Sequence, residues 1–88
     1  MTNDDDKTII IIRKIPGGWR VLRDKNFGLE KGEVSLATTC DGNLGKVMAI
    51  ECAKAAATLA MADEIVLEMD ADDAVHTRGL IDAKETEK

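Results

Sequence analysis

Residues 8–23, TIIIIRKIPGGWRVLR, decide the fold of this chain. The β-branched run at 8–12 is separated from an alternating segment at 19–23 by Pro16-Gly17-Gly18. β-Branched and aromatic residues favour strands, and proline followed by glycine between two such segments is typical of a turn. The stretch therefore predicts a β-hairpin. Because four successive isoleucines leave neither face polar, we expect the first strand to be covered on both faces or to meet a partner.

Beyond the hairpin, residues 26–32 are expected to form a loop and residues 34–40 a third strand. Asp41 and Asn43 are both good helix caps, and strong helix formers continue from Leu44 to about Ala62. A short apolar run at 65–69 predicts a last strand. The expected fold class is therefore α+β, a small antiparallel sheet with one main helix packed on it, in the order ββ(β)αβ.

The chain is expected to form one domain at residues 8–74. Residues 1–7 are interpreted as a flexible acidic leader and residues 75–88 as a flexible polar tail, because both segments are rich in polar and charged residues. A chain of 88 residues with two aromatic side chains, Trp19 and Phe27, has room for one thin core. Such a core makes association with a second copy or with a partner reasonable.

The predicted helix carries apolar residues around most of its circumference. One set recurs at spacings of three and four and is expected to cover the sheet: Leu44, Val47, Met48, Cys52, Ala55, Leu59 and Ala62. Ile50, Ala53, Ala57 and Met61 fall on the opposite side of the helical wheel. This second set is either ordinary exposed surface or a contact surface for another protein, with Ile50, Ala57 and Met61 as its candidate partner-binding residues.

The amino-acid composition is that of a globular protein, with 44% hydrophobic and 33% charged residues. The N-terminus is acidic and the apolar stretches are short, so no signal peptide and no membrane segment are expected. Cys40 and Cys52 lack a Cys-x-x-Cys spacing and are expected to be reduced. A cytoplasmic location follows as the expectation.

The net charge of −5 is unevenly distributed along the chain. Residues 7–25 contain six basic side chains and one acidic side chain, Asp24. The acidic side chains gather later, at Asp63, Glu64, Glu68, Asp70, Asp72 and Asp73. They are either solvated carboxylates or an electrostatic docking patch for a protein partner. An acidic balance argues against free nucleic acid as the main partner.

No catalytic, metal-binding or cofactor-binding set is apparent in the sequence, and a non-enzymatic protein is expected. The single histidine, His76, falls in the expected tail, far in sequence from Ser35, Cys40 and Cys52. The alternating acids at 68–73 lack the glycine and the final glutamate of a calcium-binding loop. Glycines 17, 18, 42 and 45 do not form a phosphate-binding motif and are interpreted as turn and cap residues.

One basic group of residues has the character of a nucleic-acid contact. Guanidinium and ammonium groups bind phosphates while bases stack on aromatic rings. The group comprises Arg13, Lys14, Trp19, Arg20 and Arg23. The alternative, which we favour, is that Trp19 closes the thin core and the basic side chains form a solvated edge that discourages aggregation.

Two resemblances follow from these features. The segment 9–69, with Gly17-Gly18-Trp19 after a first strand and an alanine-rich helix before Glu64, resembles an uncharacterised family of small bacterial hairpin-helix-strand domains. In size, acidity and its sheet-plus-helix plan, the chain is also similar to small phage-encoded anti-CRISPR proteins. That resemblance implies a compact acidic protein that blocks a surface on a CRISPR-Cas complex where DNA or another protein normally binds.

Three functional hypotheses follow. The leading one is a non-enzymatic binding protein, a phage-derived inhibitor that docks on a nucleic-acid-handling complex through the acidic segment and the side of the helix that carries Ile50 and Met61. The second is a homodimeric structural module whose thin core is completed by another copy. The third is a small single-strand nucleic-acid binder that uses Trp19 and the basic hairpin residues.

Overall fold

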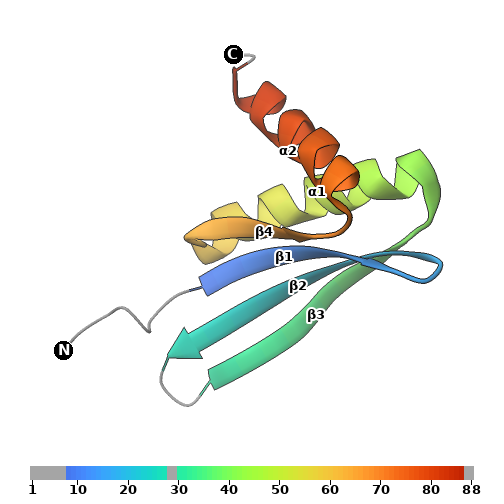
Figure 1. Ribbon diagram of the computed structural model, residues 1–88. Coiled ribbons are helices and arrows are strands. Elements are labelled where there is room, and N and C mark those ends of the chain that lie inside the picture. Colours follow the sequence, from blue (N-terminus) through green and yellow to red (C-terminus); the bar gives the residue numbers. More distant parts are fainter. Residues whose placement is uncertain (1–7, 28–29, 87–88) are drawn as a thin grey trace.

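The computed structural model describes residues 8–27 and 30–86 (Figure 1). Its elements are β1 (Thr8–Ile15), β2 (Gly18–Phe27), β3 (Glu30–Cys40), α1 (Gly42–Ala60), β4 (Glu64–Glu68) and α2 (Ala71–Thr86). The strands form one sheet in the order β3-β2-β1-β4, with α1 lying across one face. The predicted α+β class is confirmed. The expected leader at 1–7 lies outside the described residues.

The sheet is mixed, so the expectation of an antiparallel sheet is wrong for its last strand. β1, β2 and β3 are antiparallel neighbours, whereas β4 runs parallel to β1. The reason lies in the length of α1. Its 19 residues span about 28 Å and return the chain from the end of β3 to the end of the sheet where β1 begins. A strand that starts there beside β1 must run in the same direction as β1.

The predicted hairpin is confirmed. Ile15 pairs with Gly18 across a two-residue turn, in which Pro16 presets its own backbone and Gly17 adopts a positive φ of 86°. The third strand is also confirmed, but it begins at Glu30 rather than at residue 34. The loop expected at 26–32 is therefore shorter than predicted, because strand pairing continues to Phe27 and resumes at Glu30.

Helix α1 begins where the sequence indicates. Asp41 is the N-cap, and its carboxylate accepts the backbone N–H of Gly42 at 2.9 Å. At the other end, Met61 takes a left-handed conformation with φ 55°, and its N–H donates to the carbonyls of Ala57 and Thr58. The helix therefore starts two residues before the predicted Leu44 and ends two residues before Ala62.

The predicted buried face of α1 is wrong for most of its residues, although Cys52 and Ala62 are half-buried against the core. Leu44, Met48 and Leu59 are 69%, 51% and 85% exposed, whereas Ile50 is 3% exposed. Ala53 is also buried, and Ala57 is half-buried against the core, so Ile50 and Ala57 are withdrawn as partner-binding residues. Met61 remains exposed at 84%.

The observed orientation of α1 follows from side-chain size rather than from apolar content. Glycine and alanine recur on the inner face, at Gly45, Ala49 and Ala53. An added Cβ on Gly45 would lie 1.6 Å from the Cys40 carbonyl oxygen. Because small side chains let a helix axis approach a sheet closely, this face packs inward and the larger Leu44 and Met48 side chains point outward.

The core lies between the sheet and the helices. The sheet contributes Ile10, Ile12, Trp19 and Val21, α1 contributes Ala49, Ile50 and Ala53, and α2 contributes Ile81. Side chains alternate across a strand, so Ile11 and Leu22 point to the opposite face. They are nevertheless only 2% and 5% exposed. This burial bears out the expectation that both faces of the isoleucine-rich strand are covered.

The polar tail expected at 75–88 is instead helical as far as Thr86. Thr77 and Ile81, four residues apart on one face of α2, are buried. Two inward side chains among polar neighbours give a weak periodic pattern, which is why the sequence did not indicate this helix. No helix in the described part of the chain is long and apolar enough to cross a membrane.

Candidate functional site: the outer edge of β4 beside α2

Strand β4 lies at one edge of the sheet and pairs with β1 on one side only. Its other side faces α2, where Arg78 Nη2 donates to the Ile65 carbonyl at 2.8 Å. The direction of backbone N–H and C=O groups alternates along a strand, so Leu67 presents its own N–H and C=O on the same side. Within the described residues, no backbone partner satisfies these groups of Leu67. Unpaired backbone groups at a sheet edge are those to which another strand can bind.

A groove of about 520 Å³ lies beside this edge. Residues 64–67 of β4 form one wall, and Ala74, Val75 and Arg78 of α2 form the other. Val75 is 74% exposed, so the α2 wall offers apolar surface to an incoming molecule. The combination of apolar walls with unpaired backbone groups is typical of a surface that binds an extended peptide.

The six predicted acidic residues do not form one patch. Asp63 accepts the Thr8 N–H at 3.0 Å, Glu68 pairs with Arg13 at 2.6 Å, and Asp73 lies 3.6 Å from Lys46. The carboxylates of Glu64, Asp70 and Asp72 are exposed and make no ion pair with any described residue. Among the described residues, one unpaired carboxylate, that of Glu64, therefore lies within the groove-lining strand, and those of Asp70 and Asp72 follow it, while the other three contact groups elsewhere in the fold.

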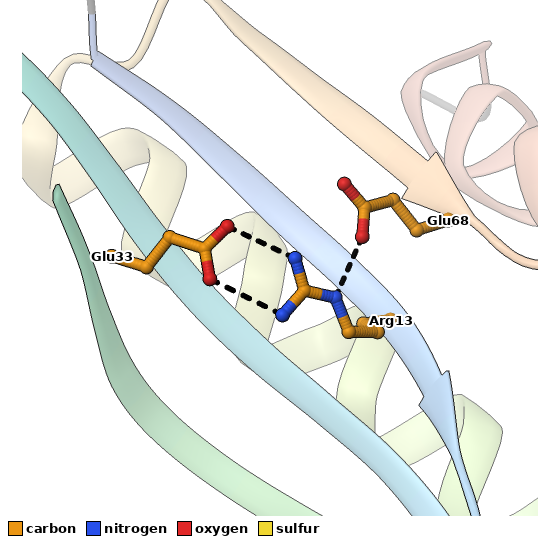
Figure 2. A network of polar contacts seen from close by, with 3 residues as sticks. All are labelled: Arg13, Glu33 and Glu68. Atoms are coloured by element: carbon orange, nitrogen blue, oxygen red, sulfur yellow. Dashed lines mark hydrogen bonds and ion pairs between the residues drawn. The ribbon is translucent and has the colours of Figure 1, made fainter.

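A second polar feature crosses the sheet face opposite α1. Figure 2 shows the Arg13 guanidinium of β1 between Glu33 of β3 and Glu68 of β4, with α1 behind the sheet. Two guanidinium nitrogens contact the two Glu33 oxygens at 3.2 and 2.9 Å, and Nε contacts Glu68. The register places Ile11 and Leu22 in the row between Arg13 and Glu33. The ion pair therefore passes over these two side chains, which explains their burial without a helix.

This network shifts the titration of its members. Hydrogen bonds from Arg13 lower the pKa of Glu33, and hydrogen bonds to Glu33 and then Glu68 raise the pKa of Arg13. Both side chains retain considerable solvent exposure, so the contribution to stability is modest and is screened by salt.

A pH dependence follows with a definite sign. Because the pKa of Glu33 is lower in the folded chain, the pair stabilises the fold above the ordinary glutamate pKa, and this contribution is lost as the pH falls through the folded-state value. We expect Glu33→Gln to be less stable than the wild type at about pH 7, with the difference shrinking as the pH falls below the ordinary glutamate pKa and through the lower folded-state value. Urea unfolding across this range, with Glu64→Gln as the exposed control, measures it. If the difference in the free energy of unfolding between Glu33→Gln and the wild type stays constant with pH, the Arg13–Glu33 ion pair is not the source of the pH dependence.

The predicted nucleic-acid group is not brought together. Trp19 is 3% exposed and packs in the core, so no base can stack on it, and the expectation that Trp19 closes the core is confirmed. The expectation of a solvated basic edge is wrong, because β1 and β2, which carry the four basic residues, are the central strands of the sheet. Lys14 lies 5.2 Å from the Trp19 ring centroid and 3.5 Å from the Asp41 carboxylate. Strand alternation places Arg20 with Arg13 on the face opposite α1, whereas Arg23 lines a small groove beneath α1. The five residues therefore occupy both faces of the sheet.

The sequence did not indicate one cluster, which is centred on a buried lysine. Lys46 of α1 is only 6% exposed, and its Nζ lies 3.1 Å from His76 Nδ1 of α2 and 5.5 Å from the Trp19 ring centroid. With Asp73 it joins α2 to α1. A lysine on an otherwise alanine-rich inner helix face was the available signal. Because His76 was expected to lie in a flexible tail, its contact with Lys46 was not predicted.

The remaining reactive side chains are dispersed. Cys40 and Cys52 are both free thiols, as expected, and His76 contacts Lys46 rather than either cysteine. In the part of the chain that the structure describes, no three histidine, cysteine or acidic residues are arranged to hold a metal ion. The β4 edge, with its groove and unpaired carboxylates, therefore remains the best candidate site.

No protein-family model, curated protein or solved structure matches the chain.

Proposed function

We propose that this is a non-enzymatic binding protein that docks on a protein partner through the outer edge of β4 and the adjoining surface of α2. The observation that carries the proposal is the unpaired backbone edge at Leu67 beside a groove of about 520 Å³. Glu64, Asp70 and Asp72 supply the electrostatic part of the surface, because their carboxylates have no ion-pair partner among the described residues.

The partner class follows from the charge. A protein of net charge −5 with free carboxylates at one edge attracts surfaces rich in lysine and arginine. Such surfaces are common where proteins hold nucleic-acid phosphates. The protein then acts as an inhibitor of a nucleic-acid-handling complex, in the manner of anti-CRISPR proteins, by engaging basic side chains that otherwise contact phosphates. The cytoplasm is the proposed location, which is compatible with two free cysteines.

Neutralisation of the free carboxylates tests the proposal. The double variant Glu64→Gln/Asp72→Asn removes two charges beside the groove, and we expect it to weaken binding to the partner by about tenfold at low salt. The control Asp24→Asn/Glu33→Gln removes the same number of charges from other strands. Partners are captured on immobilised protein, eluted with salt and then titrated by calorimetry.

Equal binding by the wild type and both double variants would refute acidic docking. Equal weakening by the two variants would also count against this edge, because net charge rather than location would then control binding. We expect the weakening to be confined to Glu64→Gln/Asp72→Asn and to diminish as salt is raised.

A second candidate function is a homodimeric module, favoured by the exposed apolar residues on α1. Leu44, Met48 and Leu59 are all more than half exposed. Apolar side chains clustered on one helix often mark a contact between protein molecules. Sedimentation at low and high micromolar concentration distinguishes the two candidates. A protein that remains monomeric throughout excludes the dimeric module and leaves the acidic docking proposal intact.

A further inference from the structure

We propose that the β4 edge binds an extended, basic segment of the partner as a fifth strand of the sheet. This inference rests on the proposed function and deepens it, because it specifies how the partner is bound and which chemistry the bound segment has. An electrostatic docking surface needs only charge complementarity, whereas strand addition also needs main-chain hydrogen bonds to Ile65 and Leu67.

The backbone supplies the first argument. The Leu67 N–H and C=O and the Ile65 N–H point away from β1 and lack backbone partners within the described residues. In the described part of the chain, the Ile65 carbonyl is held by Arg78 alone. Proteins usually protect an edge strand with a bulge, a proline or a covering element. Here α2 lies beside the edge, but its hydrogen bond to the β4 backbone comes from one long side chain, Arg78, which a main-chain donor can displace.

The side chains on either side of β4 define the occupant. Residues of an added strand that lie opposite Ile65 and Leu67 share their face of the sheet and enter the groove, which is bounded by Ala74 and Val75. These residues should be apolar. Residues on the other face lie opposite Glu64 and Glu68, where lysine or arginine is favoured. The bound segment therefore alternates basic and apolar residues over about five positions, the length of β4.

Charge also argues against a second copy of this chain as the occupant. Two antiparallel β4 strands paired at their outer edges about Val66 would place Glu64 of each copy opposite Glu68 of the other. Like charges directly opposite one another destabilise a strand pair. Glu68 is partly neutralised by Arg13, whereas Glu64 forms no ion pair with any residue that the structure describes. The edge is therefore better suited to a basic strand from another protein.

A synthetic peptide tests the inference directly. The probe is acetyl-Gly-Lys-Val-Thr-Val-Lys-Gly-amide, whose symmetric pattern suits either strand direction, and its binding to the full chain is measured by isothermal titration calorimetry. Two derivatives carry N-methyl groups, one on both valines and the other on the threonine and the second lysine. Because the N–H groups of alternate residues face β4, we expect one derivative to bind at least about tenfold more weakly and the other to bind almost normally.

The affected derivative also reports the direction of the added strand. Loss of binding with the methylated valines indicates antiparallel pairing, and loss with the other derivative indicates parallel pairing. Either result supports strand addition. A glutamate version of the probe should fail to bind, and Glu64→Gln should weaken the parent peptide. Arg78→Ala should strengthen binding several-fold, because it removes both the competing donor on Ile65 and a positive charge.

The outcomes separate this inference from the function on which it rests. If both methylated peptides bind as well as the parent while Glu64→Gln/Asp72→Asn weakens all three, docking is electrostatic and strand addition is wrong. If no peptide binds, strand addition is wrong as well, and the captured partner still tests acidic docking. If sedimentation shows a dimer that the peptide dissociates, a second copy occupies the edge and the assignment to a basic partner is overturned.

Discussion

Replacement of Gly45 by alanine is expected to lower the free energy of unfolding by about 3 kcal/mol or more, although the change adds only one methyl group. The new Cβ would lie 1.6 Å from the Cys40 carbonyl oxygen and 2.5 Å from the Cys40 carbonyl carbon. Both atoms belong to the backbone at the end of β3, so no side-chain rotation relieves the clash. The first turn of α1 must move away from the sheet, which also breaks the 2.8 Å hydrogen bond from Thr39 to the Gly45 carbonyl.

Gly79 provides the matched control, because it also lies within a helix but has no atom within 4 Å of an added Cβ. Alanine is a better helix former than glycine by up to about 1 kcal/mol, so Gly79→Ala should stabilise the protein slightly. Urea unfolding followed by circular dichroism compares the two variants. A Gly45→Ala variant as stable as the wild type would mean that α1 does not approach β3 in the way described.

The second large effect is expected at Ile50. Ile50 packs in the core at 3% exposure, so Ile50→Ala leaves a cavity beneath α1 and should cost about 2–5 kcal/mol. Leu59 lies on the same helix at 85% exposure, and Leu59→Ala should change the free energy of unfolding by no more than about 0.5 kcal/mol. Alanine is the best helix former, so neither loss arises from helix propensity.

The same unfolding experiment measures both variants, and the comparison tests the orientation of α1. The helical wheel drawn from the sequence predicts the opposite ranking, with Leu59 buried and Ile50 on the outer side. A larger loss at Leu59 than at Ile50 would therefore restore the predicted face and refute the observed core. If Ile50→Ala and Leu59→Ala lower the free energy of unfolding equally, both sides of α1 are packed. That result is expected for a helix enclosed between the sheet and a second molecule.

The candidate site was only partly predictable from the sequence. The acidic residues around β4 were recognised, but their ion pairs were not, because Arg13 and Glu68 are 55 positions apart and meet only when β4 pairs with β1. Arg78 and Val75 were assigned to a tail and therefore to no site. The free edge of β4 has no local sequence signal, since it depends on which strands lie beside it.

The sequence by itself determined the features that depend on near neighbours along the chain. These are the hairpin with its Pro16-Gly17 turn, the Asp41 cap, the extent of α1 and the existence of β4. Each arises from backbone preferences and hydrogen bonds within a few residues, and such interactions operate before any tertiary contact forms.

Tertiary structure decided which face of α1 is buried, the parallel direction of β4 and the folding of α2. Hydrophobic periodicity did not select the face, because apolar residues surround α1, and the side that packs inward is the one whose small Ala49 and Ala53 fit against the sheet. The direction of β4 followed from the length of α1, and α2 is held by Thr77, Ile81 and the contact between Lys46 and His76. Such choices rest on steric fit between segments distant in sequence, which local patterns do not encode.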